Sequence, residues 1–340
     1  MNIHKIIYFL AIVCALIGQG QEQTVGLFLN TTAAAPGYTL FAPMSYNVTY
    51  LIDNNGELVQ SWPSEYGPGL SVYILENGDL LRTRRLQGQY FQTGGRGGGV
   101  EIIDWDGNLI WEFDYFSNQY WQHHDIESLP NGNVLLIAWE HKTDAEAIAN
   151  GRNPILLGGS SQPFGFWPDH IIEVDPDSNS VVWEWHVWDH IIQDDDSSKA
   201  NYGVVSNHPE LVNINYPIGP NTDGGDWLHI NAVDYNAELD QIMLSVHHFG
   251  EIWIIDHSTT TAEAASHSGG NSGKGGDLLY RWGNPQAYIG GNSNERMFFG
   301  QHDARWIENG SIIMVFNNGS GRPGGSYTSV DVFTQPISEN

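Results

Sequence analysis

One phrase of the sequence occurs three times: HDIESLPNG at residues 124–132, HINAVDYN at 229–236 and HDARWIENG at 302–310. Each copy begins with a His that stands seven positions before an Asn, and each leads into an apolar run. An apolar strand, a turn that carries Asn and a second apolar strand are typical of a β-hairpin. A fourth copy at 70–81 has the same pattern, with Leu70 in the place of the His. The repetition indicates one structural unit used four times.

A second hairpin pattern alternates with the first. Strands end in Asp at positions 53, 104, 175 and 256, and the strand after each turn carries Trp, at 62, 111, 183 and 282. Two hairpins per unit give four strands, and such units with loops of variable length are typical of an all-β propeller. A sandwich of short strands is the alternative, but it predicts no such register. We therefore predict antiparallel blades of four strands.

About four such blades are visible, and residues 327–333 resemble the start of a fifth. A propeller closes its last blade on its first, because open sheet edges would otherwise stay unpaired. We therefore expect the chain to be cut short at its C-terminal end, with a closed ring of four blades as the alternative. The domain boundaries predicted from these patterns are a lead-in at 21–46 and a propeller at 47–340.

The chain begins like a secreted protein. Lys5, an apolar stretch over 6–17 and small residues at 18–20 predict a signal peptide over residues 1–20. No later segment has the roughly 20 apolar residues of a membrane span. Cys14 is the only cysteine, so the mature chain would carry no disulfide. We expect a secreted, periplasmic or cell-surface protein.

The charge is strongly acidic, with 13 Lys and Arg against 40 Asp and Glu and a formal net charge of −27. Such a field repels nucleic acid and anionic membranes, so we expect neither as a partner. Solubility in a salty medium is the preferred interpretation of the charge, and binding of divalent cations is the alternative.

Three histidines hold the same place in three repeats: His124, His229 and His302. In a propeller, a residue just ahead of each innermost strand points toward the central channel, so these rings are expected to converge. Together they can ligate a metal, or act as nucleophile and acid–base partners around an anion. His247 and His248 end a neighbouring strand and can add further imidazoles, whereas strand alternation predicts that His123 faces away from His124. Two aromatic residues nearby, Trp227 and Trp306, are candidates for a substrate wall or for blade packing.

These motifs resemble those of the bacterial PAPS-independent arylsulfate sulfotransferases. The resemblance rests on the stretches 123–125, 226–231, 244–248 and 301–304 in their order and spacing, and it runs from about residue 47 to 333. It implies a six-bladed propeller of the periplasm or cell exterior that moves a sulfuryl group from a phenolic sulfate ester to a phenolic acceptor through a sulfohistidine. By this resemblance His302 is the nucleophile, and His124 and His229 bind the sulfuryl oxygens and handle protons.

One position departs from the family pattern. His247 stands where the family carries an Arg, so a titratable ring replaces a permanent planar cation. The resemblance implies no cofactor, and the sequence has no Gly-x-x-x-x-Gly-Lys-Ser/Thr phosphate loop. Two other classes stay open from the residues alone: a lyase or oxygenase propeller with His-ligated Zn or Fe, and a propeller that binds without catalysis. The expected partners are small phenolic donors and acceptors.

Overall fold

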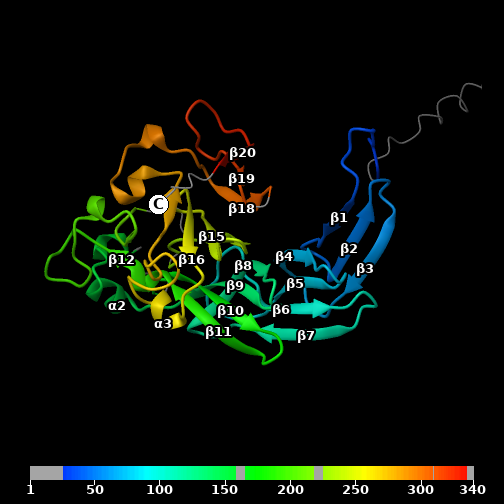
Figure 1. Cartoon of the computed structure of the whole chain (residues 1–340), viewed down its shortest axis with the longest axis horizontal. Coiled ribbons are helices and arrows are strands. Elements are labelled where there is room, and N and C mark those ends of the chain that lie inside the picture. The colour runs from blue at the N-terminus through cyan, green and yellow to red at the C-terminus, as the bar shows by residue number, and fades with distance from the viewer. Residues whose placement is uncertain (1–25, 158–164, 218–224, 309, 335–340) are drawn as a thin grey trace, which may run out of the picture. The chain divides into compact units, whose positions relative to one another are not determined.

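The computed structural model describes residues 26–157, 165–217, 225–308 and 310–334 (Figure 1). The predicted signal peptide lies outside these ranges, and within them no helix is long and apolar enough to cross a membrane. The chain forms two compact units: residues 1–41 with 49–61, and residues 42–48 with 62–340. In the first, β1 (Tyr38–Phe41), β2 (Val48–Asp53) and β3 (Leu58–Pro63) form a three-stranded sheet in chain order.

The second unit holds a series of small antiparallel sheets, each with its strands in chain order. The first contains β4 (Pro68–Ile74), β5 (Leu80–Arg85), β6 (Gly98–Ile103) and β7 (Leu109–Asp114). The next contains β8 (Tyr120–Ser128), β9 (Val134–Glu140), β10 (Asp169–Asp175) and β11 (Ser180–His186). The third contains β14 (Ile230–Asn236), β15 (Gln241–Val246), β16 (Glu251–Asp256) and β17 (Tyr280–Trp282). The last contains β18 (Gln301–Ile307), β19 (Ile312–Asn317) and β20 (Ser329–Thr334).

In the part of the chain that the structure describes, helices are confined to short segments of the loops. They are α2 (Asp144–Ala149), α3 (Thr261–Ala264) and the 3-10 turns η1 (Pro154–Leu156), η2 (Val187–His190), η3 (Val205–Asn207), η4 (Pro285–Tyr288) and η5 (Ser293–Glu295). A parallel pair, β12 (Ile191–Ile192) and β13 (Val212–Asn213), lies in the long loop after β11. The protein is therefore all-β and of the propeller class, as the alternating hairpins predict.

The count of strands differs from the prediction of four-stranded blades throughout. Three sheets of the described chain have four strands, and the sheets that begin and end it have three. Each full sheet joins a His-phrase hairpin to the Asp-and-Trp hairpin that follows it. The segment interpreted as the start of a fifth unit is consequently the third strand of the last sheet, since β20 pairs with β19 along its whole length. The turns at Asn77-Gly78 and Asn131-Gly132 are equivalent corners of their sheets, whereas Asn309 lies outside the described residues.

The first strand of each sheet in the second unit lies beside the first strand of the next. β14 packs between β8 and β18, and β4 packs beside β8. Hydrogen bonds join these inner strands directly: Val233 N–H donates to Asp125 Oδ2 at 3.2 Å, and Trp306 N–H donates to Asp234 Oδ2 at 2.5 Å. The His-bearing phrases are thus brought to the centre of the unit from strands that are far apart in sequence.

A bulge lies at or next to the repeated His in three inner strands. The pairing register shifts between Gln122 and Ile126 in β8, between Ile230 and Ala232 in β14, and between His302 and Arg305 in β18. His124 within the first bulge and His229 just before the second have positive φ angles of 50° and 55°. In β18 the positive φ of 49° falls on Asp303, one residue after His302. A bulge interrupts the alternation of side chains between the two faces of a sheet, so it changes the direction in which the imidazole points.

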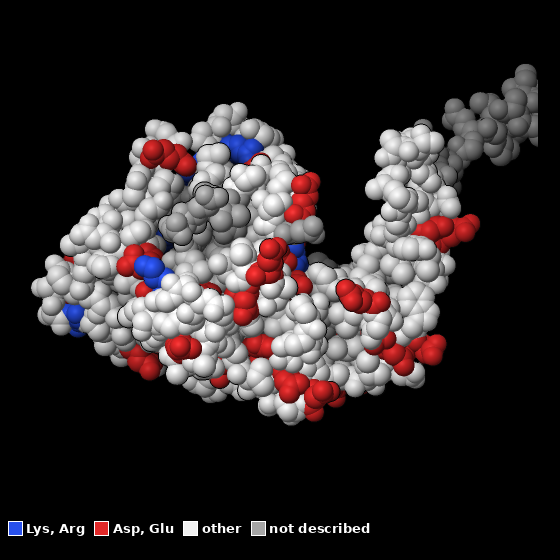
Figure 2. Space-filling view, in the orientation of Figure 1, with Lys and Arg blue, Asp and Glu red and all other residues white. Residues whose placement is uncertain are grey.

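Arg305 ties the inner strands together. From β18 its guanidinium contacts Asp125 and Glu127 of β8 at 3.1 and 2.6 Å and Asp234 of β14 at 3.3 Å. It also hydrogen-bonds the Tyr73 hydroxyl of β4. Asp303 of its own strand lies 3.0 Å from the same guanidinium, so one cation meets four carboxylates and the cluster keeps an excess of negative charge. Acidic side chains also predominate on the face drawn in Figure 2.

Candidate active site

Five imidazole rings form a continuous cluster at the inner ends of three sheets. The ring centres of His124 and His229 lie 4.4 Å apart, and that of His229 lies 4.9 Å from His248 and 5.3 Å from His247. His247 in turn lies 5.2 Å from His302. The structure therefore brings together the five histidines that the sequence analysis named as site candidates. His124 lies in β8, His229 just before β14, His247 and His248 just after β15, and His302 in β18.

The tautomer of His302 follows from its hydrogen bonds. Its Nδ1 lies 3.1 Å from the carbonyl oxygen of Gly300 and 3.0 Å from Oδ1 of Asn318. Both partners are acceptors, so Nδ1 carries the proton and the neutral ring keeps its lone pair on Nε2. The ring is half-buried. An imidazole held in this state presents a nucleophilic nitrogen without needing a base to deprotonate it.

His229 is oriented by a buried carboxylate. Its Nδ1 lies 2.5 Å from Oδ2 of Asp226, and Oδ1 of Asp226 accepts the indole N–H of Trp139 at 3.0 Å. Burial opposes ionisation of Asp226, but attraction to His229 and the hydrogen bond outweigh it and hold the pKa of that carboxyl below its usual value. Asp226 is therefore the acceptor, and His229 Nδ1 is a donor. This role could not be predicted from the sequence, because an Asp three residues before a His also occurs in ordinary turns.

His124 is the inner end of a buried chain of three side chains. Its Nδ1 lies 2.8 Å from Nδ1 of His123, whose Nε2 lies 2.8 Å from Oδ1 of Asp169. Oδ2 of Asp169 accepts the backbone N–H of Ile230 at 3.1 Å. The prediction that His123 faces away from His124 is wrong, because the bulge in β8 interrupts the alternation of the strand. His123 instead stacks on Trp139 with ring centres 3.8 Å apart.

Burial favours the neutral form of two rings of the cluster. Desolvation, followed by the neighbouring imidazoles, lowers the pKa of His124 well below its usual value and that of His247 to about 3. Desolvation also raises the pKa of Asp169 well above its usual value, with the charge of Asp226 as a further cause. The rings of His124 and His247 are therefore neutral. An anion that enters would reverse part of this effect, because negative charge favours the protonated form of each nearby imidazole.

A glycine loop fixes the position of His124. The backbone N–H of His124 donates to the carbonyl oxygen of Gly95 at 2.7 Å. A Cβ at Gly95 would lie 1.9 Å from the imidazole of His124, and Gly95 has a φ of 85°. Only glycine meets both conditions. Gly95 therefore forms part of the wall of the site.

The two tryptophans considered as a substrate wall lie elsewhere. Trp227 is fully buried in the core, with its ring 4.9 Å from Phe166 and 5.6 Å from Phe249. Trp306 lies four residues beyond His302 on β18, roughly 13 Å along the strand. There it lines a separate pocket of about 330 Å³ together with residues 234–238. Trp227 is therefore a packing residue, the other interpretation that the sequence allowed, whereas Trp306 packs against a core cluster and also lines that pocket.

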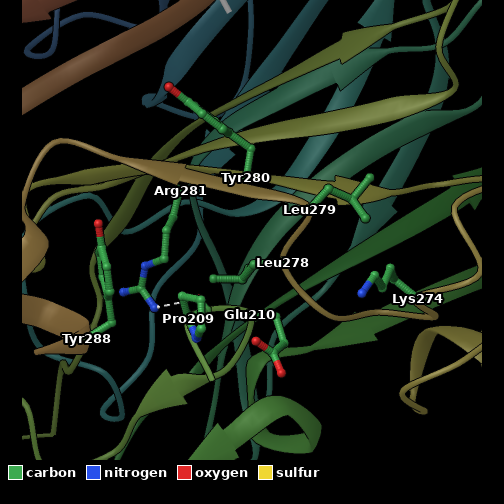
Figure 3. A pocket seen from close by; sticks show the side chains of 8 residues that line it. All are labelled: Pro209, Glu210, Lys274, Leu278, Leu279, Tyr280, Arg281 and Tyr288. Carbon is green, nitrogen blue, oxygen red and sulfur yellow. Dashed lines mark hydrogen bonds between the residues drawn. The ribbon is translucent and has the colours of Figure 1, made fainter. Parts of the chain in front are cut away.

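A second pocket, of about 390 Å³, lies against β17 and the loop before it (Figure 3). Its only Arg is already engaged: Arg281 pairs with Glu251 at 2.5 Å, donates to the carbonyl oxygens of Pro209 and Leu211, and stacks on Tyr288. None of the five clustered histidines lines this pocket. The imidazole cluster, rather than either of these pockets, concentrates reactive groups.

Comparison with known proteins places this geometry in context. No relative was found among the curated proteins. Among solved structures, hydrazine synthase of Kuenenia stuttgartiensis is 15% identical over 88% of this chain and 68% of that chain, with a TM-score of 0.49. A protein of unknown function from Bacteroides caccae is 12% identical over 84% of this chain and 66% of that chain, with a TM-score of 0.43.

The family comparison is more extensive. The family model described as Arylsulfotransferase (ASST) matches residues 29–331, which include all five clustered histidines and the sheets that carry them. The chain therefore belongs to the arylsulfotransferase (ASST) family.

Proposed function

We propose that the protein transfers a sulfuryl group from an aryl sulfate ester to a phenolic acceptor, with His302 as the covalent carrier. Membership of the family supports aryl sulfotransferase activity in general. The observation that carries the finer proposal is the state of His302, whose Nδ1 is held by two carbonyl-type acceptors. Nε2 is then the nitrogen with the lone pair. The ring of His247 lies next to that of His302, and the rings of His229, His124 and His248 continue the cluster beyond it.

The proposed reaction has two balanced steps. In the first, His302 Nε2 forms a bond to sulfur while the bond from sulfur to the aryl oxygen breaks, and the leaving phenolate takes a proton from a neighbouring imidazole. In the second, the oxygen of the acceptor phenol attacks sulfur, its proton passes to that imidazole, and the N–S bond breaks. Transfer of this kind depends mainly on positioning and on donors aimed at the transferring oxygens. His229, held by Asp226, is placed to be one such donor.

His124 is the proposed proton donor, and Asp169 supplies its proton through His123. Because the pKa of Asp169 is raised, the neutral chain holds one proton on Asp169, one on His123 Nδ1 and one on His124 Nε2. When His124 Nε2 gives its proton to the phenolate, the other two protons shift by one hydrogen bond each and Asp169 becomes ionised. The low pKa of His124 is then no obstacle, since the donor is a neutral ring.

In this proposal His247 takes the role of the family Arg only when it is protonated. Its pKa of about 3 makes the ring neutral, and its buried Nδ1 has no hydrogen-bond partner in the described part of the chain. A sulfate ester brings negative charge beside this ring and favours its protonation. The site would thus acquire its cation together with the substrate, at the expense of activity at high pH.

A second candidate function is favoured by one observation. Ligand atoms of Asp226, His229 and His248 all lie within 4.8 Å of one another, a set that can hold a Zn or Fe ion. A metal at these residues would make the site that of a metal-dependent lyase or oxygenase. Element analysis of the purified protein separates the two candidates. One equivalent of metal that is lost in His248→Ala, together with activity that a chelator abolishes, would favour the second.

The decisive test of the first candidate is intact-mass spectrometry after brief incubation with 4-nitrophenyl sulfate. The wild-type protein should gain the mass of one SO₃ group, and peptide mapping should place it on His302. His302→Ala should show neither the adduct nor turnover, whereas His208→Ala, at an exposed His paired with Glu210, should show both. Turnover by His302→Ala, or an adduct that maps to another residue, would contradict the proposal.

We also propose that the protein acts outside the cytoplasm. The support is the charged, apolar and small-residue pattern of residues 1–20. Expression with the native N-terminus in a bacterial host should yield a secreted or periplasmic form whose first residue follows about residue 20. A cytoplasmic product that keeps Met1 would contradict this proposal.

A further inference from the structure

A second cluster of histidines lies away from the proposed active site. His190 ends η2, just after the second sheet, whereas His267 and Asp277 belong to the insertion between β16 and β17. Nδ1 of His190 and Nδ1 of His267 lie 2.8 and 2.7 Å from the same carboxylate oxygen, Oδ1 of Asp277. Ligand atoms of the three side chains all lie within 4.8 Å of one another. Two imidazoles and a carboxylate from two separate loop segments thus converge on one point.

The hydrogen bond at Nε2 leaves the other nitrogen of His190 for a ligand. Its Nε2 lies 2.8 Å from the carbonyl oxygen of Ala264, which can only accept, so Nε2 carries the proton of the neutral tautomer. The lone pair of that tautomer is then on Nδ1, the nitrogen that lies 2.8 Å from Asp277 Oδ1. The imidazole is fully buried, which fixes this orientation. A metal ion can bind Nδ1, and the N–H to carbonyl bond at Nε2 is the outer contact that metal-binding histidines usually make.

The surroundings of His190 are built to hold it. Trp185 stacks on its ring with centres 5.8 Å apart and donates its indole N–H to the carbonyl oxygen of Gly276 at 2.7 Å. A Cβ at Gly276 would lie 2.5 Å from His190 Nε2 and 2.0 Å from the carbonyl oxygen of Ala264. The residue before Asp277 therefore packs directly against the imidazole. Two of the three ligands are held rigidly before any ion arrives.

The third ligand leaves a path for an ion. The side chain of His267 is 62% exposed, whereas those of His190 and Asp277 are buried. An ion can thus reach the buried pair from solvent, and a water molecule can complete its coordination. The acidic chain, with a net charge of −27, raises the local concentration of cations.

We propose that His190, His267 and Asp277 form a zinc site that fastens the β16–β17 insertion to the second sheet. Two imidazole nitrogens with one carboxylate oxygen suit Zn²⁺, while Ca²⁺ and Mg²⁺ prefer oxygen ligands alone. The site is structural, because it joins two segments 87 residues apart, the separation of His190 and Asp277. It does not depend on the proposed sulfuryl transfer.

The test is a titration of the full-length protein with Zn²⁺, followed by calorimetry and by thermal unfolding. It is made in a His248→Ala background, because Asp226, His229 and His248 offer a competing set of ligands. This protein should bind one Zn²⁺, and its Tm should rise by roughly 3–5 °C at a hundredfold excess over Kd. Adding His267→Gln, an exposed change, or Asp277→Asn, a change of equal size, should weaken binding at least about tenfold.

The matched control is His208→Gln, which removes another exposed His that lies 2.9 Å from a carboxylate. It should leave both Zn²⁺ affinity and the Tm shift unchanged. Co²⁺ in place of Zn²⁺ should give the visible bands of a four-coordinate site, and His267→Gln should remove them. The proposal is overturned if the His248→Ala protein binds no Zn²⁺, or if His267→Gln and Asp277→Asn bind it as well as that protein does. In either case the cluster is a buried ion pair only.

Discussion

At the scale of single residues, this chain has His247 where the family carries an Arg, and this difference predicts how kcat/KM depends on pH. With a pKa of about 3 the ring of His247 is neutral, so its charge during turnover depends on the anionic substrate and on pH. His247→Arg should therefore preserve or raise kcat/KM with 4-nitrophenyl sulfate and should flatten its decline above neutral pH. The pH profiles of the two proteins, measured side by side, check this. If His247→Arg instead loses both its activity at every pH and one equivalent of bound metal, that result would favour the metal-dependent alternative.

The proton chain behind His124 makes a prediction about leaving groups. Asp169→Asn keeps the size of the side chain and a hydrogen bond to His123, but it cannot pass a proton along the chain. For phenyl sulfate, whose leaving phenolate is strongly basic, kcat should fall by roughly 10²–10³, within the range of general acid catalysis. For 4-nitrophenyl sulfate, which needs little protonation, the loss should be less than about tenfold. Equal losses for both donors would show that Asp169 only supports the fold.

The loop that carries Gly95 can be tested with a neighbouring residue as its control. Gly95→Ala would place a methyl group inside the space of the His124 ring at a positive φ, so the ring must move. A displacement of about 1 Å can reduce turnover roughly 100-fold. Gly94→Ala meets no atom within 4 Å and should leave kcat and KM unchanged. If both variants keep wild-type kcat, the site tolerates a displaced His124, and the proposed role of that ring is wrong.

At the scale of elements, Glu127 couples the packing of the inner strands to pH. Burial raises the pKa of Glu127 to about 7 and outweighs the attraction of Arg305, with Asp234 and Asp125 as further causes. The unfolded carboxyl titrates near 4.3, so between that pH and about 7 the folded form binds more protons. The contribution of Glu127 to stability is thus full at acidic pH and is lost as pH rises through 7, by about 3 kcal/mol.

Urea unfolding of the wild-type protein and of Glu127→Gln at pH 5 and pH 8 measures this contribution. Gln cannot ionise, so the variant should gain about 3 kcal/mol relative to wild type between pH 5 and pH 8. Parallel stability curves for the two proteins would mean that Glu127 is not titrating in this window.

Arg305, the ion-pair partner of Glu127, also acts at the scale of elements, because it holds β8 and β14 against β18. Arg305→Met would leave Asp125, Glu127 and Asp234 buried or nearly so without their common partner. Removing one partner from a buried ionic cluster destabilises by about 3–5 kcal/mol. Urea unfolding at pH 8 should show a loss of this size. Arg322→Met, at a partly buried Arg that stacks on Tyr327, is the control and should change stability little.

At the scale of the whole molecule, the net charge of −27 opposes the approach of an anionic donor. Salt shortens the range of this repulsion, to about 8 Å at 0.15 M ionic strength. The value of kcat/KM for an aryl sulfate should consequently rise as NaCl is increased from low to physiological concentration, while KM for an uncharged phenol should stay constant. Steady-state kinetics over this range check the prediction. A fall of kcat/KM for the donor with salt would point instead to attraction by a local positive field.

The sequence alone determined the repeated unit, the all-β propeller class and the clustering of five histidines. These follow from local patterns: turn residues and apolar periodicity specify hairpins, and equal positions in equal hairpins become neighbours around an axis. Only the tertiary structure decided which groups control those rings. Asp169 reaches His123 across 46 residues, and Gly95 approaches His124 from the preceding sheet. Such contacts depend on bulges and on how neighbouring sheets pack, and neither leaves a periodic trace in the sequence. The role of Trp227 could not be predicted from the sequence either. Tryptophan is equally typical of a protein core and of the wall of a substrate site, and only the tertiary packing shows which of the two it belongs to.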